Sequence, residues 1–122
     1  MPIAYKVDVA LGIVLADWRG TVTAKDITEH WTRFVADKAA MACGGAITDI
    51  SCCDILFTPE ELKAVTKKIL EPALRGKNWK TAVIVKNPVQ FGVTKQQEIF
   101  SETFVKMNVF YSDVMARKWV LG

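Results

Sequence analysis

Histidine, cysteine and long hydrophobic runs are scarce in this 122-residue chain, which has one histidine and three cysteines. The odd cysteine count and the absence of C-x-x-C spacing argue against a disulfide framework and against a structural zinc site. No apolar stretch approaches the about 20 residues that a membrane-spanning helix needs. The first residues enter a strand-like pattern without the charged and then apolar order of a signal peptide. These absences predict a cytoplasmic protein without a metal site or a transmembrane segment.

Motifs for phosphate binding and for nucleophilic catalysis are also missing. Gly44-Gly45 is an isolated turn signal, and the chain has neither a G-x-G-x-x-G nor a G-x-S-x-G sequence. Cys52 and Cys53 follow a strand-like segment, but a catalytic thiol needs a proton acceptor, and nothing in the sequence places His30 near them. Four acidic residues near the same strand end lack regular metal-ligand spacing: Asp49, Asp54, Glu60 and Glu61. We therefore expect no catalytic residues, no metal and no cofactor, and a thiol enzyme is the least favoured function.

The composition favours one folded domain. Hydrophobic residues make up 51% and charged residues 24% of the chain, which excludes a disordered protein. A length of 122 residues suits one domain, which we predict to span residues 1–122.

The net charge of +3 arises in the second half of the chain, where basic residues cluster between positions 63 and 80. Because a nucleic-acid-binding domain is usually more basic than this, we expect no nucleic-acid partner.

Strand-like and helix-like segments alternate along the chain. Alternating and short apolar runs predict strands at 5–9, 13–18, 46–51, 79–85 and 109–111. Helical spacing and capping sequences predict these helices: 23–39, 58–70, 94–107 and 112–120. We expect a proline at position 72 to stop or kink the second helix. The order β-β-α-β-α-β-α-β-α therefore predicts an α/β domain with a mixed, mostly parallel sheet and an antiparallel first hairpin.

Four stretches in this order resemble the STAS-like (SpoIIAA-like) family, which includes bacterial anti-sigma-factor antagonists. They are the opening hairpin at 13–23, the strand, loop and helix start at 48–62, the strand and loop at 82–92, and the ending at 109–119. Within this fold the chain resembles a small stand-alone family that is grouped with STAS and CRAL-TRIO lipid-transfer domains. The resemblance covers nearly the whole chain and implies a single-domain STAS-like fold.

The resemblance also indicates where a regulatory phosphate would be placed. Anti-sigma-factor antagonists carry the phosphoacceptor serine in an Asp-Ser-Ser-Gly-like turn after the third strand, and the added charge disrupts the partner interface. This chain has no such motif there. The candidate phosphoacceptors in the corresponding region are Ser51, which we interpret as a strand-end residue, and Thr58, which we interpret as a helix cap.

Two functions are compatible with these patterns. The leading prediction is a non-catalytic regulatory or protein-interaction module, with a protein partner or a homodimer, because no catalytic constellation is present. The alternative is a carrier or sensor of a small apolar or lipid-like ligand, bound in a pocket between helices and sheet. Aromatic and sulfur side chains that could line such a pocket are Phe91, Phe100, Phe104 and Met107. The interpretation without a ligand is ordinary core packing of these residues.

Overall fold

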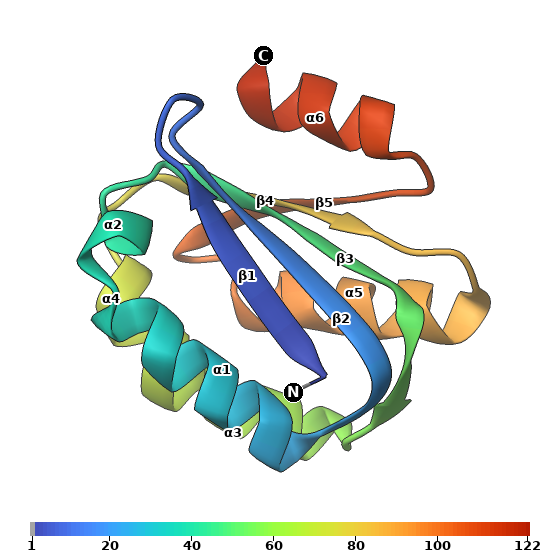
Figure 1. The fold of residues 1–122 in the computed structure, drawn as a ribbon. Helices are drawn as coiled ribbons and strands as arrows, with labels where there is room; N and C mark the ends of the chain where they lie inside the picture. The colour runs from blue at the N-terminus through green and yellow to red at the C-terminus, as the bar shows by residue number, and fades with distance from the viewer. Residues whose placement is uncertain (1) are drawn as a thin grey trace.

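A five-stranded sheet forms the centre of the computed structural model, which describes residues 2–122 (Figure 1). The strands lie side by side in chain order: β1 (Ile3–Asp8), β2 (Ile13–Thr23), β3 (Gly45–Leu56), β4 (Trp79–Ile84) and β5 (Val105–Phe110). β1 and β2 are antiparallel, whereas each later neighbouring pair is parallel. The predicted α/β class, the mixed sheet and the antiparallel first hairpin are therefore confirmed.

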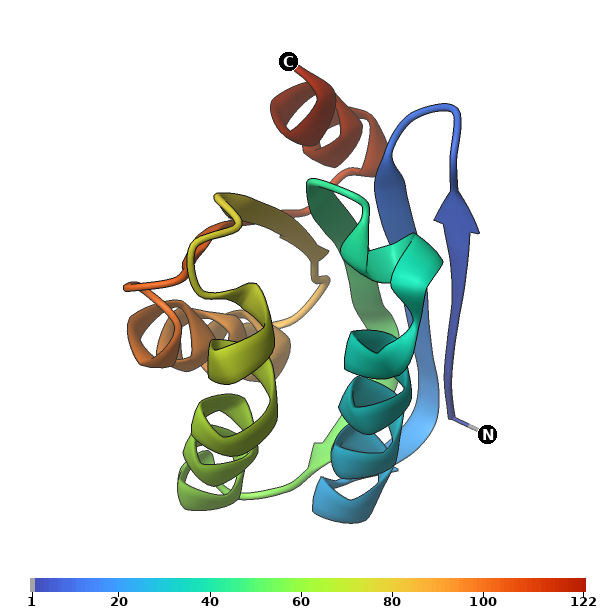
Figure 2. The same ribbon diagram turned by 90° about the vertical axis from the view of Figure 1, so that its left-hand side faces the viewer.

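Helices cover both faces of the sheet (Figure 2). The helix α6 (Asp113–Leu121) lies on one face, where Ala116 packs in a small core with Ile13 and Ile47. The larger core lies on the opposite face, beneath the connections between the parallel strands. Right-handed crossovers place successive helices on the same face when the strands follow one another in order. These segments are α1 (Ala24–Ala36), α2 (Lys38–Met41), α3 (Pro59–Val65), the π-helical turn η1 (Thr66–Leu70), α4 (Glu71–Leu74) and α5 (Pro88–Phe100).

The strand β3 is longer than the predicted strand at 46–51 and also includes residues 52–56. The reason is the neighbouring strand β2, which also continues beyond its predicted end. After a register shift between Asp17 and Arg19, the residues from Arg19 to Thr23 pair with those from Cys52 to Leu56. Because β2 and β3 pair with each other along these residues, the sheet continues beyond the apolar segments from which the two strands were predicted.

The second helical passage continues past Pro72 as far as Leu74. Just before the proline the chain widens into the π-helical turn, in which the backbone N–H of Glu71 donates to the carbonyl of Thr66, five residues earlier. A proline inside a regular α-helix lacks one N–H and collides with the preceding turn. The wide turn changes the local hydrogen-bond pattern, so the helical passage runs through Pro72 without stopping there.

The predicted boundaries of the helix at 94–107 are wrong. Asn87 caps the observed helix α5, because its side chain accepts a hydrogen bond from the backbone N–H of Gln90, and Pro88 occupies the first turn. The helix ends at Phe100, and β5 begins at Val105. Asn87-Pro88 is a start signal that overrides the capping sequence at 94–97, which falls inside the helix.

Candidate functional site

A cavity of about 100 Å³ lies between the sheet and the helices of the larger core. The strands β2, β3 and β4 form its floor through small and branched side chains such as Val14, Ala46 and Val83. Phe34 on α1 and Leu70 on η1 contribute to the helical side. None of the described residues that line the cavity is an Asp, Glu, Lys or Arg. Three of the four tryptophans of the chain also line it: Trp18, Trp31 and Trp79.

Two polar atoms of the cavity wall lack a hydrogen-bond partner among the residues that the structure describes. They are the indole Nε1 of Trp18 and the imidazole Nδ1 of His30. Both residues are buried, with 6% of Trp18 and 4% of His30 exposed. Leaving a buried donor or acceptor unpaired costs about 1–3 kcal/mol, so such atoms are rare in proteins and commonly pair with a bound water, ion or ligand.

His30 projects from α1 into an aromatic environment. Its ring meets the ring of Tyr5 edge-on, with 5.5 Å between the centroids, and stacks on Phe34 at 6.3 Å. Burial, together with the charge of Arg33, lowers the pKa of His30 to about 4. The imidazole is therefore neutral at pH 7 and has one N–H and one lone pair. A neutral imidazole of this kind can either donate or accept a hydrogen bond inside the cavity.

The buried face of α5 is polar, which is unusual for a helix that packs on a sheet. Gln90, Thr94 and Gln97 are its buried residues, and Ser101 follows at the same spacing. Ile99 is 64% exposed. Phe100, Phe104 and Met107 pack in or against the larger core, but Phe104 and Met107 lie beyond the end of the helix, so they do not share a helical face with Phe100. The four polar residues are spaced by four, three and four positions, which is the spacing of one helical face, so this spacing was the signal in the sequence for the face that is buried.

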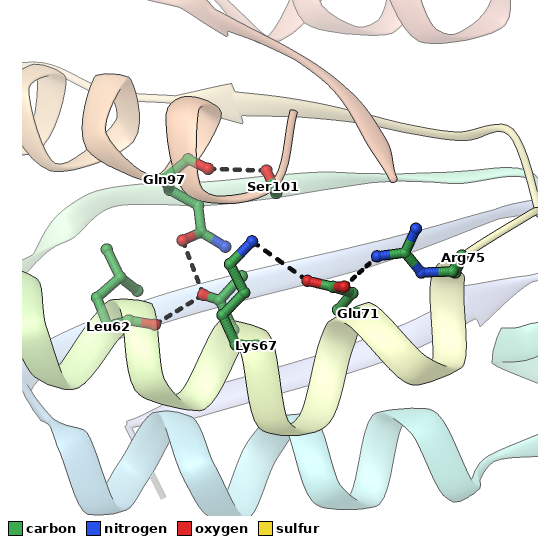
Figure 3. A network of polar contacts seen from close by, with 7 residues as sticks. Leu62, Lys67, Glu71, Arg75, Gln97 and Ser101 are labelled. Atoms are coloured by element: carbon green, nitrogen blue, oxygen red, sulfur yellow. Dashed lines mark hydrogen bonds and ion pairs between the residues drawn. The ribbon is translucent and has the colours of Figure 1, made fainter. Parts of the chain in front are cut away.

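Thr66 joins the π-helical turn to α5 beside the cavity (Figure 3). Its hydroxyl lies 2.7 Å from the carbonyl oxygen of Leu62 and 2.9 Å from Oε1 of Gln97. A hydroxyl has one proton, so these two acceptors share it. Ser101 in turn donates to the carbonyl of Gln97 at 2.7 Å. These bonds engage the side-chain oxygen and the backbone carbonyl of Gln97 and hold this residue in place.

The same helical passage also carries an ion-pair network (Figure 3). Glu71 pairs with Lys67, at 3.2 Å between Nζ and Oε1, and with Arg75 one turn further along. The hydrogen bonds from Arg75 and from Lys67 lower the pKa of the Glu71 carboxyl. The pairs follow the i, i+4 spacing of neighbours on a helix surface, so this part of the basic cluster stabilises the helix locally.

Gln90 connects α5 to the far end of β3. Its Nε2 donates to the carbonyl oxygens of Ser51 and Cys53, at 3.2 and 3.0 Å, and its Oε1 accepts from the backbone N–H of Lys86 at 2.8 Å. β3 pairs with β4 only as far as Asp49. Beyond that point the side chain of Gln90 supplies hydrogen bonds that a neighbouring strand would otherwise provide.

The two candidate phosphoacceptors have local roles. Ser51 donates from its hydroxyl to Oδ1 of Asp49 at 2.6 Å. Thr58 caps α3: its hydroxyl accepts from the backbone N–H of Glu61 at 3.1 Å, and the Glu61 carboxylate accepts from the N–H of Thr58. Neither residue lines the cavity. Their phosphorylation stays a prediction.

The predicted pocket residues lie at different places. Met107 lines the cavity. Together with Phe104 it also borders a wider, open groove of about 800 Å³ beside α5 and β5. Phe91 stacks on the ring of Tyr111, at 6.3 Å, and Phe100 packs half-buried against the core. Phe91 and Phe100 line neither of these two hollows.

Among the described residues, no hydrogen bond joins a cysteine thiol to His30. Burial, followed by the charges of Asp54 and Asp49, raises the pKa of the Cys53 thiol to about 11, whereas Cys52 is exposed. Within residues 2–122, no group of three or more His, Cys, Asp or Glu residues is arranged to hold a metal ion. In the same range no helix is long and apolar enough to cross a membrane.

Comparison with known proteins shows the fold. No family model and no curated protein matches the chain. Among solved structures it is similar to the crystal structure of an uncharacterized protein from the DUF3478 family with a SpoIIAA-like fold, from Shewanella loihica PV-4. The TM-score is 0.67 at 18% sequence identity, and the match covers 97% of this chain and 93% of the other. The chain therefore has a SpoIIAA-like fold, as the STAS-like resemblance of its sequence predicted.

Proposed function

We propose that this chain is a non-catalytic binding module that takes up a small, mostly apolar molecule in the cavity beneath its sheet. The supporting observation is the cavity of about 100 Å³ with two unpartnered polar atoms, on Trp18 and His30, in its wall. Protein interiors are closely packed, and a void of this volume costs about 2 kcal/mol in lost contacts. A ligand that fills the cavity recovers these contacts, which favours binding.

The volume of the cavity sets the size of the ligand. An apolar cavity of about 150 Å³ suffices for benzene, and one water takes up about 30 Å³. A cavity of about 100 Å³ therefore fits a ring-sized molecule after small side-chain movements, and it is too small for a long acyl chain. We accordingly favour a sensor or carrier of a small ring compound over a carrier of lipids.

The chemistry of the wall supports binding without catalysis. Among the described lining residues there is no cysteine, serine or carboxylate to act as a nucleophile or as a partner for His30. The ring of His30 contacts the rings of Tyr5 and Phe34. Nucleophilic catalysis needs a nucleophile and a base within hydrogen-bond reach, and general acid–base catalysis needs a group with a pKa near the working pH.

Thermal unfolding with and without benzene tests the proposal. We expect saturating benzene to raise the Tm of the wild-type protein by about 2–6 °C, because a ligand that binds only the folded state stabilises it. Ala46→Val adds methyl groups within the cavity wall and should abolish this shift. Val120→Ala, on the opposite face of the sheet, should lower the Tm but leave the shift unchanged. A wild-type Tm that responds to neither benzene nor phenol would contradict the proposal.

A protein-interaction role is a second candidate, favoured by exposed apolar side chains at one edge of the sheet. Val89 lies in the first turn of α5, Tyr111 in the connection from β5 to α6 and Val114 in the first turn of α6, and all three are more than half exposed. The carboxyl ends of the parallel strands β4 and β5 share this edge. Sedimentation of the wild-type protein and of Val114→Glu tests self-association: a dimer that dissociates in the variant supports it, and a monomer in both contradicts it.

A further inference from the structure

Some polar groups of the cavity wall have a hydrogen-bond partner within the protein, and others do not. Trp79 donates from its indole Nε1 to the hydroxyl of Thr81 at 2.9 Å, so this tryptophan is satisfied within the protein. The hydroxyl of Thr94 donates to the carbonyl of Gln90. Gln97 is engaged by Thr66. Among the described residues, the fully buried side-chain nitrogen and oxygen atoms of lining residues that lack a partner are on Trp18 and His30.

The charge and shape of the wall restrict the ligand further. The described lining residues carry no full charge at pH 7, since none is acidic or basic apart from the neutral His30. A charged ligand would be buried without a counter-charge, at high cost. Aromatic side chains on several sides favour a flat ring, because aromatic pairs gain from offset and edge-to-face contacts. These rings belong to Trp18, Trp31, Phe34, Phe57 and Trp79.

We propose that the cavity binds a small uncharged phenol, whose ring packs among the tryptophans and whose hydroxyl oxygen accepts a hydrogen bond from the indole N–H of Trp18. This inference rests on the proposed function, because it names the chemical class of the ligand for the same cavity. An indole N–H donates only, so the ligand must supply an acceptor. A hydrocarbon ring of the same size would fill the space and leave that N–H unpaired.

His30 explains why a hydroxyl suits the cavity better than a group that only accepts. A neutral imidazole carries either a proton or a lone pair on Nδ1, depending on its tautomer. A hydroxyl both accepts and donates, so it can pair with either form, whereas an ether or a carbonyl can pair with only one. A hydroxyl therefore suits the hydrogen-bonding capacity of His30 whichever tautomer the imidazole adopts.

Binding of phenol and of benzene to the wild-type protein tests the inference, since the two probes differ by one hydroxyl. Trp18, Trp31 and Trp79 line the cavity, so tryptophan fluorescence reports binding of both probes. We expect phenol to bind about tenfold more tightly than benzene, the ratio that one buried hydrogen bond provides. In nitrogen-15 NMR spectra, phenol should also move the indole N–H resonance of Trp18 downfield, and benzene should not.

Two tryptophan variants locate the hydrogen bond. Trp18→Phe removes the indole N–H and keeps an aromatic ring, so the preference for phenol over benzene should fall to about twofold or less. Trp119→Phe is the matched control, because Trp119 packs against the core on the opposite face of the sheet. It should keep the full preference. If Trp18→Phe does not fold, the wild-type affinity ratio and the indole resonance still decide the question.

The outcomes separate this inference from the proposed function. Equal affinities of phenol and benzene in the wild-type protein would overturn the inference and leave the binding module intact. The inference also fails if the preference is the same in Trp18→Phe as in the wild-type protein. If neither probe binds, both the inference and the proposed function are wrong.

Discussion

The hydroxyl of Thr66 lies 2.9 Å from Oε1 of Gln97 and joins the π-helical turn to α5 at the wall of the cavity. Both residues are buried, so neither group can exchange this contact for water at no cost. π-helical turns frequently occur at functional sites. Here the turn places a threonine against the helix that carries the polar side of the cavity.

Thr66→Val should destabilise the protein by about 1–3 kcal/mol, because the isosteric side chain leaves Oε1 of Gln97 without its buried partner. Urea unfolding measures this change. Lys63→Ala, on the exposed side of α3, is the matched control and should change stability by no more than about 0.5 kcal/mol. Equal stabilities of Thr66→Val and the wild-type protein would show that the contact contributes nothing.

Gln90→Leu should loosen the end of β3 more than the rest of the sheet. The variant loses the hydrogen bonds to the carbonyls of Ser51 and Cys53 in a region where β4 no longer pairs with β3. We expect a loss of about 2–3 kcal/mol in stability and faster amide hydrogen exchange in residues 51–56 than in residues 45–49. Uniform acceleration across β3 would contradict this local role for Gln90.

Acidification should destabilise the protein through His30. Burial and Arg33 lower the pKa of His30 to about 4 in the folded state, while the ordinary value is 6.5. Between these values the unfolded chain binds a proton that the folded protein does not, so stability is complete above about pH 6.5 and falls as the pH drops towards 4. The total loss is at most about 3 kcal/mol.

Comparing the free energy of unfolding of the wild-type protein with that of His30→Phe at pH 7, 5.5 and 4.5 isolates the contribution of His30 to this loss of stability. Hydrogen bonds and ion pairs also lower the pKa values of Asp26, Asp37 and Glu71, but these carboxyl groups remain in both proteins. The wild-type protein should therefore lose more stability than the variant as the pH falls. Parallel pH profiles would mean that His30 takes up a proton equally well in the folded state.

Cys53 should resist alkylation in the folded protein. Its thiol is buried, and the pKa raised to about 11 leaves little thiolate at neutral pH. Peptide mass spectrometry after iodoacetamide treatment at pH 7.5 should find Cys52 modified first and Cys53 modified only in urea. Fast, selective modification of Cys53 in the native protein would restore the hypothesis of a thiol enzyme.

Elements that depend on nearby residues were predicted well from the sequence. The capping interactions of Thr23 with Asp26 and of Thr58 with Glu61 are present, because each joins residues only three positions apart. The alternation of strands and helices, and hence the α/β class, follows from equally short patterns of apolar residues. The antiparallel hairpin from β1 to β2 was predictable because its connection is short.

Elements that depend on distant partners were predicted less well. The extension of β3 needs the matching extension of β2, and the start of α5 depends on which of two capping sequences the surrounding structure uses. The buried face of α5 was missed because its polar residues are satisfied by groups elsewhere in the chain, as Gln97 is by Thr66. Buried polar residues contradict the apolar pattern on which sequence interpretation relies.

The sequence by itself determined the alternation of strands and helices and the caps at Thr23 and Thr58, since these follow from periodicity and from contacts within a few residues, and its resemblance to the STAS-like family indicated the SpoIIAA-like fold. Only the tertiary structure decided that a cavity exists and that Trp18 and His30 share its wall without partners. The cavity depends on how side chains from strands and helices pack together across the core. Whether a polar atom is paired likewise depends on which distant atoms come within about 3 Å of it, and no local pattern encodes that distance.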